Sequence, residues 1–367
     1  MPVSWVCSLA RALEQSQADC GIAAVIKYLG SKKRLIGLIE NAVLSVPDVN
    51  VVVDLFSGTS RVGQALKRRG LQVIANDHNA YAHTLARCYV EADAARMSDN
   101  VTRLVAELNA LPPRAGWFTH TYCERSRFFQ PKNGAKVDAI RDAIAAKSLE
   151  PVLEAVLLTS LMEAADRVDS TVGVQMAYLK SWADRANKDF EMRVPEMIPS
   201  SQSKPCSAHR LDAVEASSVL SGDVVYLDPP YNAHSYLSNY HIWETIVAWD
   251  RPEVYGVACK RVDCRLRKSP FNSRAHFKLA LQTIVRRLDA RALVVSFSNE
   301  GYLTKQELLQ ILQTRGPVAV VEQSGFRRYV GAKIGIYNPS GHKVGAVSHT
   351  ENTEYIFVVS VDTPPTP

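Results

Sequence analysis

The stretch that decides the fold is residues 224–232, which read VVYLDPPYN. Four apolar residues in a row favour a buried parallel strand. Two prolines follow Asp228 and must end the strand, because neither can donate a backbone N–H. Asp228 is therefore expected at the carboxyl end of a strand, which is where open α/β sheets bind their ligands.

The residues that follow this strand suit the binding of a planar base. The rigid prolines keep the carboxylate of Asp228, a backbone carbonyl and the ring of Tyr231 close together. The carboxylate and the carbonyl can accept the two hydrogens of an exocyclic amine, and the ring can stack on the base. An Asp-Pro turn that merely ends a strand is the simpler interpretation. The full order favours a base-binding site made by Asp228, Pro229, Pro230 and Tyr231.

Length and composition indicate a globular protein with two domains, or with one domain that carries a large insertion. The chain has 367 residues, of which 47% are hydrophobic and 22% are charged. It lacks an apolar run of about 18 residues, so no membrane span is expected. The first 15 residues lack the apolar core of a signal peptide. Seven cysteines without a C-x-x-C pair favour reduced thiols, a cytoplasmic location and no metal site.

A mild excess of positive charge is compatible with a polyanionic partner. The net charge is +6, and basic residues crowd the segment that follows the proposed base-binding strand. We expect contacts between this segment and nucleic-acid phosphates, although a solvated surface is the alternative. The basic residues of this segment are Lys260, Arg261, Arg265, Arg267, Lys268 and Arg274.

A turn before the first clear helical pattern is a second candidate site. Apolar residues at three- and four-residue spacing predict a helix over residues 32–43. Before it, Gly30 and Ser31 form a small-residue turn flanked by Lys27, Tyr28 and Lys32. The start of a helix presents free N–H groups and attracts a carboxylate. A plain helix start with exposed lysines is the alternative.

Residues 50–77 predict a Rossmann-type unit. A buried strand over residues 50–55 leads into a glycine-bearing turn and a helix that ends at Gly70. This strand–turn–helix order suits a nucleotide-like ligand, although the dinucleotide fingerprint G-x-G-x-x-G is absent. A second strand over residues 71–75 ends at Asn76 and Asp77. The carboxylate of Asp77 is placed to accept both hydroxyls of a ribose.

The remaining pattern predicts a helical insertion followed by a return to the sheet. Helical spacing covers residues 101–108, 135–146 and 152–166, and the basic, aromatic loop between them contains Arg125 and Arg127, which could reach base edges. Later helices are expected at 240–248, 275–288 and 305–313, and later strands at 292–296, 318–322 and 354–361. Residues 329–348 predict a hairpin with a long tip. The resulting divisions are 22–92, an insertion at 93–205, 206–361, and a disordered tail at 362–367.

Taken together, these motifs resemble the Dam-like class of adenine-specific DNA methyltransferases, from about residue 27 to residue 359. The DPPY tetrad is the most specific mark. KYLGSK at 27–32 is similar to the family's K-W-x-G-G-K, and DLFSGTS at 54–60 is similar to its D-x-F-x-G-x-G, with Ser60 for the last glycine. Asp77 stands at the position of the ribose-binding acid. Asp212 stands where the family has an Asp near the cofactor's adenine.

The resemblance implies S-adenosylmethionine as methyl donor and a Rossmann-like, seven-stranded sheet with one antiparallel strand at 354–361. It makes residues 22–92 and 206–361 the cofactor-binding and catalytic parts of one α/β domain, and the insertion a target-recognition domain for double-stranded DNA. A monomer in the bacterial cytoplasm or nucleoid is expected, with a separate restriction endonuclease as a candidate partner. The implied cofactor-binding residues are Lys27, Tyr28, Gly30, Lys32, Asp54, Phe56, Ser57, Gly58, Thr59, Asp77 and Asp212.

The expected reaction methylates the amine of an adenine flipped out of the duplex. Hydrogen bonds from the amine to Asp228 and to the carbonyl of Pro229 would free its lone pair for in-line attack on the methyl group. Transfer to a cytosine amine is an alternative, but that class more often carries Ser in place of Asp228. An RNA adenine methyltransferase is a second alternative, but the long insertion favours duplex DNA as the substrate. A non-catalytic DNA-binding module is disfavoured by the intact Asp228 and Asp77.

Overall fold

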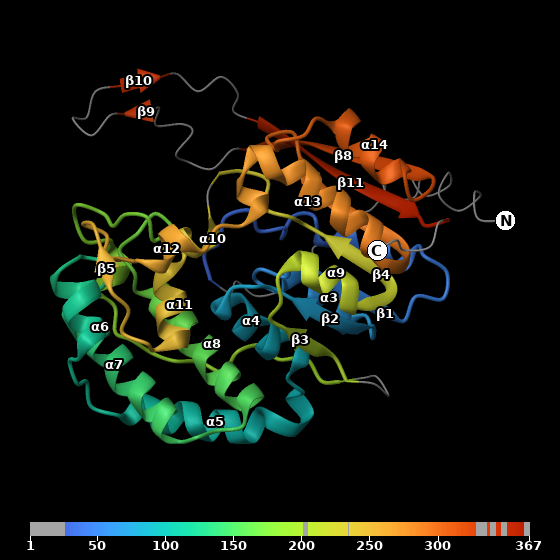
Figure 1. Ribbon diagram of the computed structural model, residues 1–367. Helices are drawn as coiled ribbons and strands as arrows, with labels where there is room; N and C mark the ends of the chain where they lie inside the picture. Colours follow the sequence, from blue (N-terminus) through green and yellow to red (C-terminus); the bar gives the residue numbers. More distant parts are fainter. Residues whose placement is uncertain are drawn as a thin grey trace.

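A twisted seven-stranded sheet forms the centre of the protein in a computed structural model (Figure 1). The structure describes residues 26–200, 205–233, 235–327, 336–337, 343–345 and 351–362. The strand order is β3-β2-β1-β4-β7-β11-β8. The strands of this sheet are β1 (Val51–Asp54), β2 (Gln72–Asn76), β3 (Ser207–His209), β4 (Ser221–Leu227), β7 (Asp289–Ser298), β8 (Val318–Arg327) and β11 (Glu351–Ser360).

The strand directions confirm the predicted fold class. Strand β1 is parallel to β2 and to β4, with Val52 opposite Val224, and β4 is parallel to β7. Strand β11 runs antiparallel to both of its neighbours, β7 and β8. The antiparallel strand is therefore the one that the sequence predicted.

Two short antiparallel pairs lie outside this sheet. One joins β5 (Val254–Tyr255) to β6 (Lys260–Arg261), which the sequence analysis missed. The other joins β9 (Ile336–Tyr337) to β10 (Lys343–Gly345), as expected for a hairpin within residues 329–348. The other residues of that segment, and the predicted tail from residue 363 onward, lie outside the described part of the chain.

Helices cover both faces of the sheet, which explains why its central strands are apolar at nearly every position. Val224 and Tyr226 of β4 face α2 (Ile36–Leu44) and α3 (Arg61–Arg68). Val225 and Leu227 face the opposite layer, which consists of α9 (Ala213–Val219), α13 (Arg274–Arg287) and α14 (Lys305–Gln313). Helices α3, α13 and α14 match the predicted patterns, and α2 begins at Ile36 because residues 32–35 form a turn. The sequence analysis missed α9.

A third apolar core lies among the helices beside the sheet (Figure 1). Its helices are α4 (Ala80–Ala86), α5 (Ala94–Ala110), α6 (Trp117–Thr119), α7 (Pro131–Ala146), α8 (Pro151–Arg167) and α11 (His241–Ala248). Tyr240 and Trp243 share this core with Tyr122 and Leu161, although they follow the DPPY strand. The predicted insertion thus packs with helices from both flanking segments, and its boundaries as a domain stay a prediction.

Short helical turns connect these elements. They are the π-helical turns at Arg87–Glu91 and His120–Glu124, the 3-10 turns at Asp184–Asn187 and Pro270–Asn272, α10 (Tyr236–Asn239) and α12 (Asp263–Leu266). In the described part of the chain, none of the helices combines the length and the apolar character that crossing a membrane requires.

Candidate active site

A cavity of about 340 Å³ opens at the carboxyl ends of β1, β2 and β4. Open α/β sheets bind their ligands at this edge. Asp228 and Pro230 line the cavity, beside nearly all of the residues that the sequence analysis assigned to the cofactor. Those lining residues are Tyr28, Gly30, Lys32, Asp54, Phe56, Ser57, Gly58, Thr59, Asp77 and Asp212.

The turn after β1 holds the first wall of the cavity in place. The amide of Ser57 donates to the carbonyl of Asn76 (2.9 Å) at the end of β2. The Asn76 side chain in turn donates to the carbonyls of Leu55 and Leu211, both at 3.2 Å. Ser60 adopts a left-handed φ of 58°, a conformation that favours glycine. Serine therefore occupies a position whose backbone conformation favours glycine, the residue that the family's motif has there.

Asp77 is held in a fixed orientation by backbone and side-chain donors. One carboxylate oxygen accepts from the amide of Gly58 (3.1 Å). The other accepts from the amide and the side chain of Asn79 (2.9 and 3.3 Å). A carboxylate has about four acceptor positions, so Asp77 keeps capacity for a ligand hydroxyl. The sequence analysis missed Asn79, whose position two residues after Asp77 was the available signal.

At the other end of the cavity, Asp228 forms an ion pair with Lys32. The ammonium of Lys32 lies 3.2 Å from Asp228 and 3.3 Å from Glu354 of β11, and all three side chains are largely buried. Burial raises the pKa of Asp228 to about 6 against the opposing effect of Lys32, and the negative charge of Glu354 raises it further. Burial disfavours the charged form of Lys32, but the two carboxylates outweigh it and raise its pKa.

Asp54 is a second buried acid in the cavity wall. Asp54 is the last residue of β1, and it is only 1% exposed. Burial, and then the charges of Asp228 and Asp77, raise the pKa of Asp54 to about 8. A carboxyl in this setting is poised to ionise when a cation enters the cavity.

Tyr231 does not line the cavity with Asp228. Its ring packs edge-on against Phe297, with centroids 5.6 Å apart, and the ammonium of Lys32 lies 5.9 Å from the Tyr231 centroid. Tyr236 of α10 lines the cavity instead and stacks on Tyr28, with centroids 5.1 Å apart. Its hydroxyl leaves so little room that a Cβ on Gly30 would lie 2.9 Å from it. The sequence analysis missed Tyr236, and no motif marks it.

Lys27 lies apart from the other predicted cofactor-binding residues. Its ammonium pairs with Asp166 of α8 (3.0 Å) and with Asp169 (3.3 Å). Its backbone amide also donates to Asp166 (3.1 Å). The side chain therefore fastens the segment before α2 to the helical core rather than lining the cavity.

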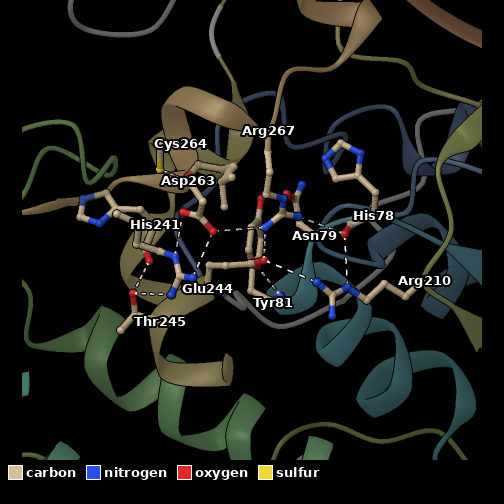
Figure 2. A network of polar contacts seen from close by, with 12 residues as sticks. His78, Asn79, Tyr81, Arg210, His241, Glu244, Thr245, Asp263, Cys264 and Arg267 are labelled. Carbon is tan, nitrogen blue, oxygen red and sulfur yellow. Dashed lines mark hydrogen bonds and ion pairs between the residues drawn. The ribbon is translucent and has the colours of Figure 1, made fainter. Parts of the chain in front are cut away.

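Two of the predicted DNA-binding residues, Arg267 and Lys268, also line the cavity. Arg267 donates to Glu244 of α11 (2.8 Å), a carboxylate whose side chain is 2% exposed. Glu244 also accepts from the amide of Tyr81 (3.1 Å) and lies 3.9 Å from Arg210. Both arginines donate to the carbonyl of His78, next to Asp77 (Figure 2). Arg267 thus joins the end of α12 to helix α11 and to the segment after β2.

The other predicted DNA-binding side chains lie on the helical core, on β6 and α12, or on α13. Arg265 stacks on Tyr255 at 3.6 Å from the ring centroid, and Arg274 lies 5.2 Å from that of Tyr302. Arg125 is exposed. Three further contacts complete the set: Arg127 lies 4.7 Å from the centroid of Trp182 and donates to the carbonyl of Lys180, and Lys260 contacts the sulfur of Met176.

The sheet and the cavity define the class of protein. A seven-stranded sheet with one antiparallel strand, with an Asp-Pro-Pro-Tyr turn beside a cavity at its carboxyl edge, is a Rossmann-like methyltransferase. Residues 28–310 match the D12 class N6 adenine-specific DNA methyltransferase family. The chain belongs to this family and is an enzyme that methylates adenine in DNA, which confirms the predicted function.

Named relatives agree with this assignment. The chain is 30% identical to the type II methyltransferase M.NlaIII of Neisseria lactamica over 320 residues, which cover 84% of this chain and 93% of that protein. It is 28% identical to the type II methyltransferase M.FokI of Planomicrobium okeanokoites (92% of this chain, 53% of that protein). It is 27% identical to the modification methylase StsI of Streptococcus sanguinis (84% and 50%). The chain spans about half the length of the latter two.

Proposed function

We propose that the chain transfers the methyl group of S-adenosylmethionine to the amine of an adenine flipped out of duplex DNA. The observation that carries this proposal is that one cavity joins the turn after β1 and Asp77 to Asp228. A nucleoside-like ligand and a base amine can therefore meet in one space. A base inside a duplex cannot reach such a cavity, so flipping is required.

The cofactor would lie between the two ends of this cavity. Asp77 would accept a ribose hydroxyl of the cofactor. The rings of Phe56 and Phe271, which meet edge-on at 5.1 Å, would border its adenine together with Asp212. S-adenosylmethionine supplies an electrophilic methyl group on a positively charged sulfur. Asp54 would balance that positive charge. Lys27, which is paired with Asp166 and Asp169, would act by holding its segment against the helical core.

Asp228 would activate the adenine amine. Its carboxylate and the carbonyl of Pro229 would accept the two amine hydrogens, which draws the nitrogen lone pair out of conjugation with the ring. The amine nitrogen must lose a proton after transfer, and Asp228, which would already accept a hydrogen bond from it, would take that proton. We propose that Tyr231, which lies outside the cavity lining, orients Asp228 and Lys32. We also propose that the ring of Tyr236, which stacks on Tyr28, borders the target base.

The helical core would carry target recognition. Residues 93–205 would read the sequence through the loop of Arg125 and Arg127, and Lys260, Arg265 and Arg274 would contact phosphates. Because Arg267 is paired with Glu244, we propose that it shapes the cavity instead of contacting phosphates. We further propose a cytoplasmic monomer that protects DNA against a separate endonuclease, since the relatives are named type II or modification enzymes.

The test is product analysis with the purified protein. Duplex DNA is incubated with S-adenosylmethionine labelled in the methyl group, and the nucleosides are separated after digestion. Labelled N6-methyl-2′-deoxyadenosine from the DNA supports the proposal. Label on cytosine, or transfer to RNA in preference to DNA, would overturn it. Sequencing of the modified positions then gives the recognition site.

A further inference from the structure

Glu354 is a largely buried acid beside the proposed catalytic carboxylate, and it lies beyond the residues that match the family. It belongs to β11, the antiparallel strand, where it stands opposite Ser298 of β7. Its side chain is 13% exposed, and its carboxylate lies 3.3 Å from the ammonium of Lys32. The residues lining the cavity do not include it. Glu354 can therefore act on the reaction through its contact with Lys32 and through its charge, but not by touching a ligand in the cavity.

The arrangement places one cation between two acids. Among the described residues, Lys32 is the one cation within ion-pair distance of Asp228, at 3.2 Å. An ammonium has three donors in a flexible arrangement. Without a second acceptor, all of these donors would be available to Asp228, whose oxygens the adenine amine also needs. Glu354 takes part of that donor capacity.

We propose that Glu354 is a positioning residue for methyl transfer, which holds the ammonium of Lys32 to one side and leaves Asp228 free to accept the adenine amine. This inference rests on the role proposed above for Asp228. It goes beyond that role, because the family motifs contain Asp228 and Lys32 but not an acid on the antiparallel strand. In this arrangement the charge of Lys32 favours the ionised form of Asp228. The contact with Glu354 keeps Lys32 from donating to the carboxylate oxygens of Asp228 that the amine needs.

The charge of Glu354 has a second effect, which makes the proposal testable by pH. Repulsion from Glu354 adds to burial in raising the pKa of Asp228, so removing the charge should lower it. Other groups also face Asp228, and none of them is substituted in the test. They are Lys32 before α2, Asp54 of β1, Tyr226 of β4, Tyr231 after β4 and Tyr236 of α10.

The experiment compares the single-turnover rate of methyl transfer in the wild-type protein and in Glu354→Gln from about pH 5 to about pH 9. The amide can still accept from Lys32 but carries no charge. We expect the acid limb of the profile to move to lower pH and the plateau rate to fall about tenfold, as for a misplaced catalytic group. The cofactor concentration that gives half of the maximal single-turnover rate should stay within about twofold, because Glu354 does not line the cavity.

Glu322→Gln is the matched control. Glu322 lies on the neighbouring strand β8, opposite Tyr355, and its half-exposed side chain pairs with Lys305. The same change of acid to amide there should leave the acid limb and the plateau at their wild-type values. An equal shift in the control would show that the limb responds to net charge alone, and would overturn the proposal.

The position of the acid limb decides the outcome. A folded Glu354→Gln protein with a wild-type limb overturns the proposal, whatever its plateau rate. Where that variant fails to fold, Glu354→Asp is measured instead, and its withdrawn carboxylate should move the limb in the same direction by a smaller amount. A wild-type limb there also overturns the proposal. Production of N6-methyladenine by the wild-type protein would leave the proposed function standing in either case.

Discussion

Two buried clusters of charge lie at the two ends of the cavity, and they are built in opposite ways. At one end Glu244 is a single acid that accepts from Arg267 and from the Tyr81 amide, with Arg210 nearby. At the other end two acids, Asp228 and Glu354, share the single cation Lys32. The first cluster has donors in excess, and the second has acceptors in excess.

The difference separates a carboxylate that holds structure from one that is kept for a ligand. A buried acid surrounded by donors is satisfied, and removing it leaves cations without a partner. A buried acid with spare acceptor positions is costly until a ligand donates to it. By this comparison, Glu244 holds structure around the cavity, whereas Asp228 keeps acceptor positions for the amine that we propose it binds.

The largest effect is expected at the acceptor-rich end. Replacing Asp228 with Ala should lower the rate of methyl transfer by about a thousandfold or more, as for the loss of a preorganised catalytic group. Cofactor binding, followed by calorimetry, should change little, because Asp77 and the turn after β1 remain. A variant with near wild-type turnover would show that Asp228 is not the acceptor.

The free energy of unfolding should respond in the opposite order to the rate: the substitution at Glu244 should lower it more than the substitution at Asp228. Glu244→Gln should lower the free energy of unfolding by about 1–3 kcal/mol, less than the ~3–5 kcal/mol of a fully buried pair, because Arg267 and Arg210 are partly exposed. Asp228→Asn should leave it unchanged or raise it at neutral pH. The folded pKa of Asp228 is raised to about 6, so its ionised form costs stability as the pH rises through that value. Urea unfolding of both variants at neutral pH measures the contrast, and equal losses would contradict it.

Asp54 predicts a pH dependence of cofactor binding. Its pKa is raised to about 8 in the free protein, so it is mostly protonated at neutral pH. A cationic ligand favours the ionised form and expels the proton. Affinity for S-adenosylmethionine should therefore increase with pH, by at most about tenfold per unit, until about pH 8. Calorimetry of the wild-type protein and of Asp54→Asn gives the comparison, and the variant should lose the dependence. An identical slope in both would assign the titration to another group.

The sequence predicted the sheet and most of the cavity because each carries a local signal. The buried strands are continuous apolar runs, and residues such as Asp54, Asp77 and Asp228 follow them directly, so the common edge of a parallel sheet brings them together. The ion pairs carry no such signal. Lys27 pairs with Asp166, which is 139 residues away in the sequence, and Lys32 pairs with Glu354, which is 322 residues away. The packing of α11 in the helical core was hidden for the same reason, since an amphipathic helix does not reveal which surface it covers.

The smallest expected effect is on the salt dependence of DNA binding. Its measurement tests whether an arginine already paired with a carboxylate can also bind a phosphate. Each phosphate that a protein neutralises contributes about 0.9 to the slope of log affinity against log salt concentration. Lys260 and Arg265 contact a thioether and an aromatic ring, so their charges remain available to DNA. The double variant Lys260→Ala with Arg265→Ala should reduce the slope by up to about 1.8. Arg267→Gln should leave it unchanged, because the charge of Arg267 is already matched by Glu244. Binding to one duplex at several salt concentrations measures both slopes, at a temperature where each variant is folded. A reduced slope for Arg267→Gln would place that residue at the DNA and remove the distinction between the two kinds of cluster.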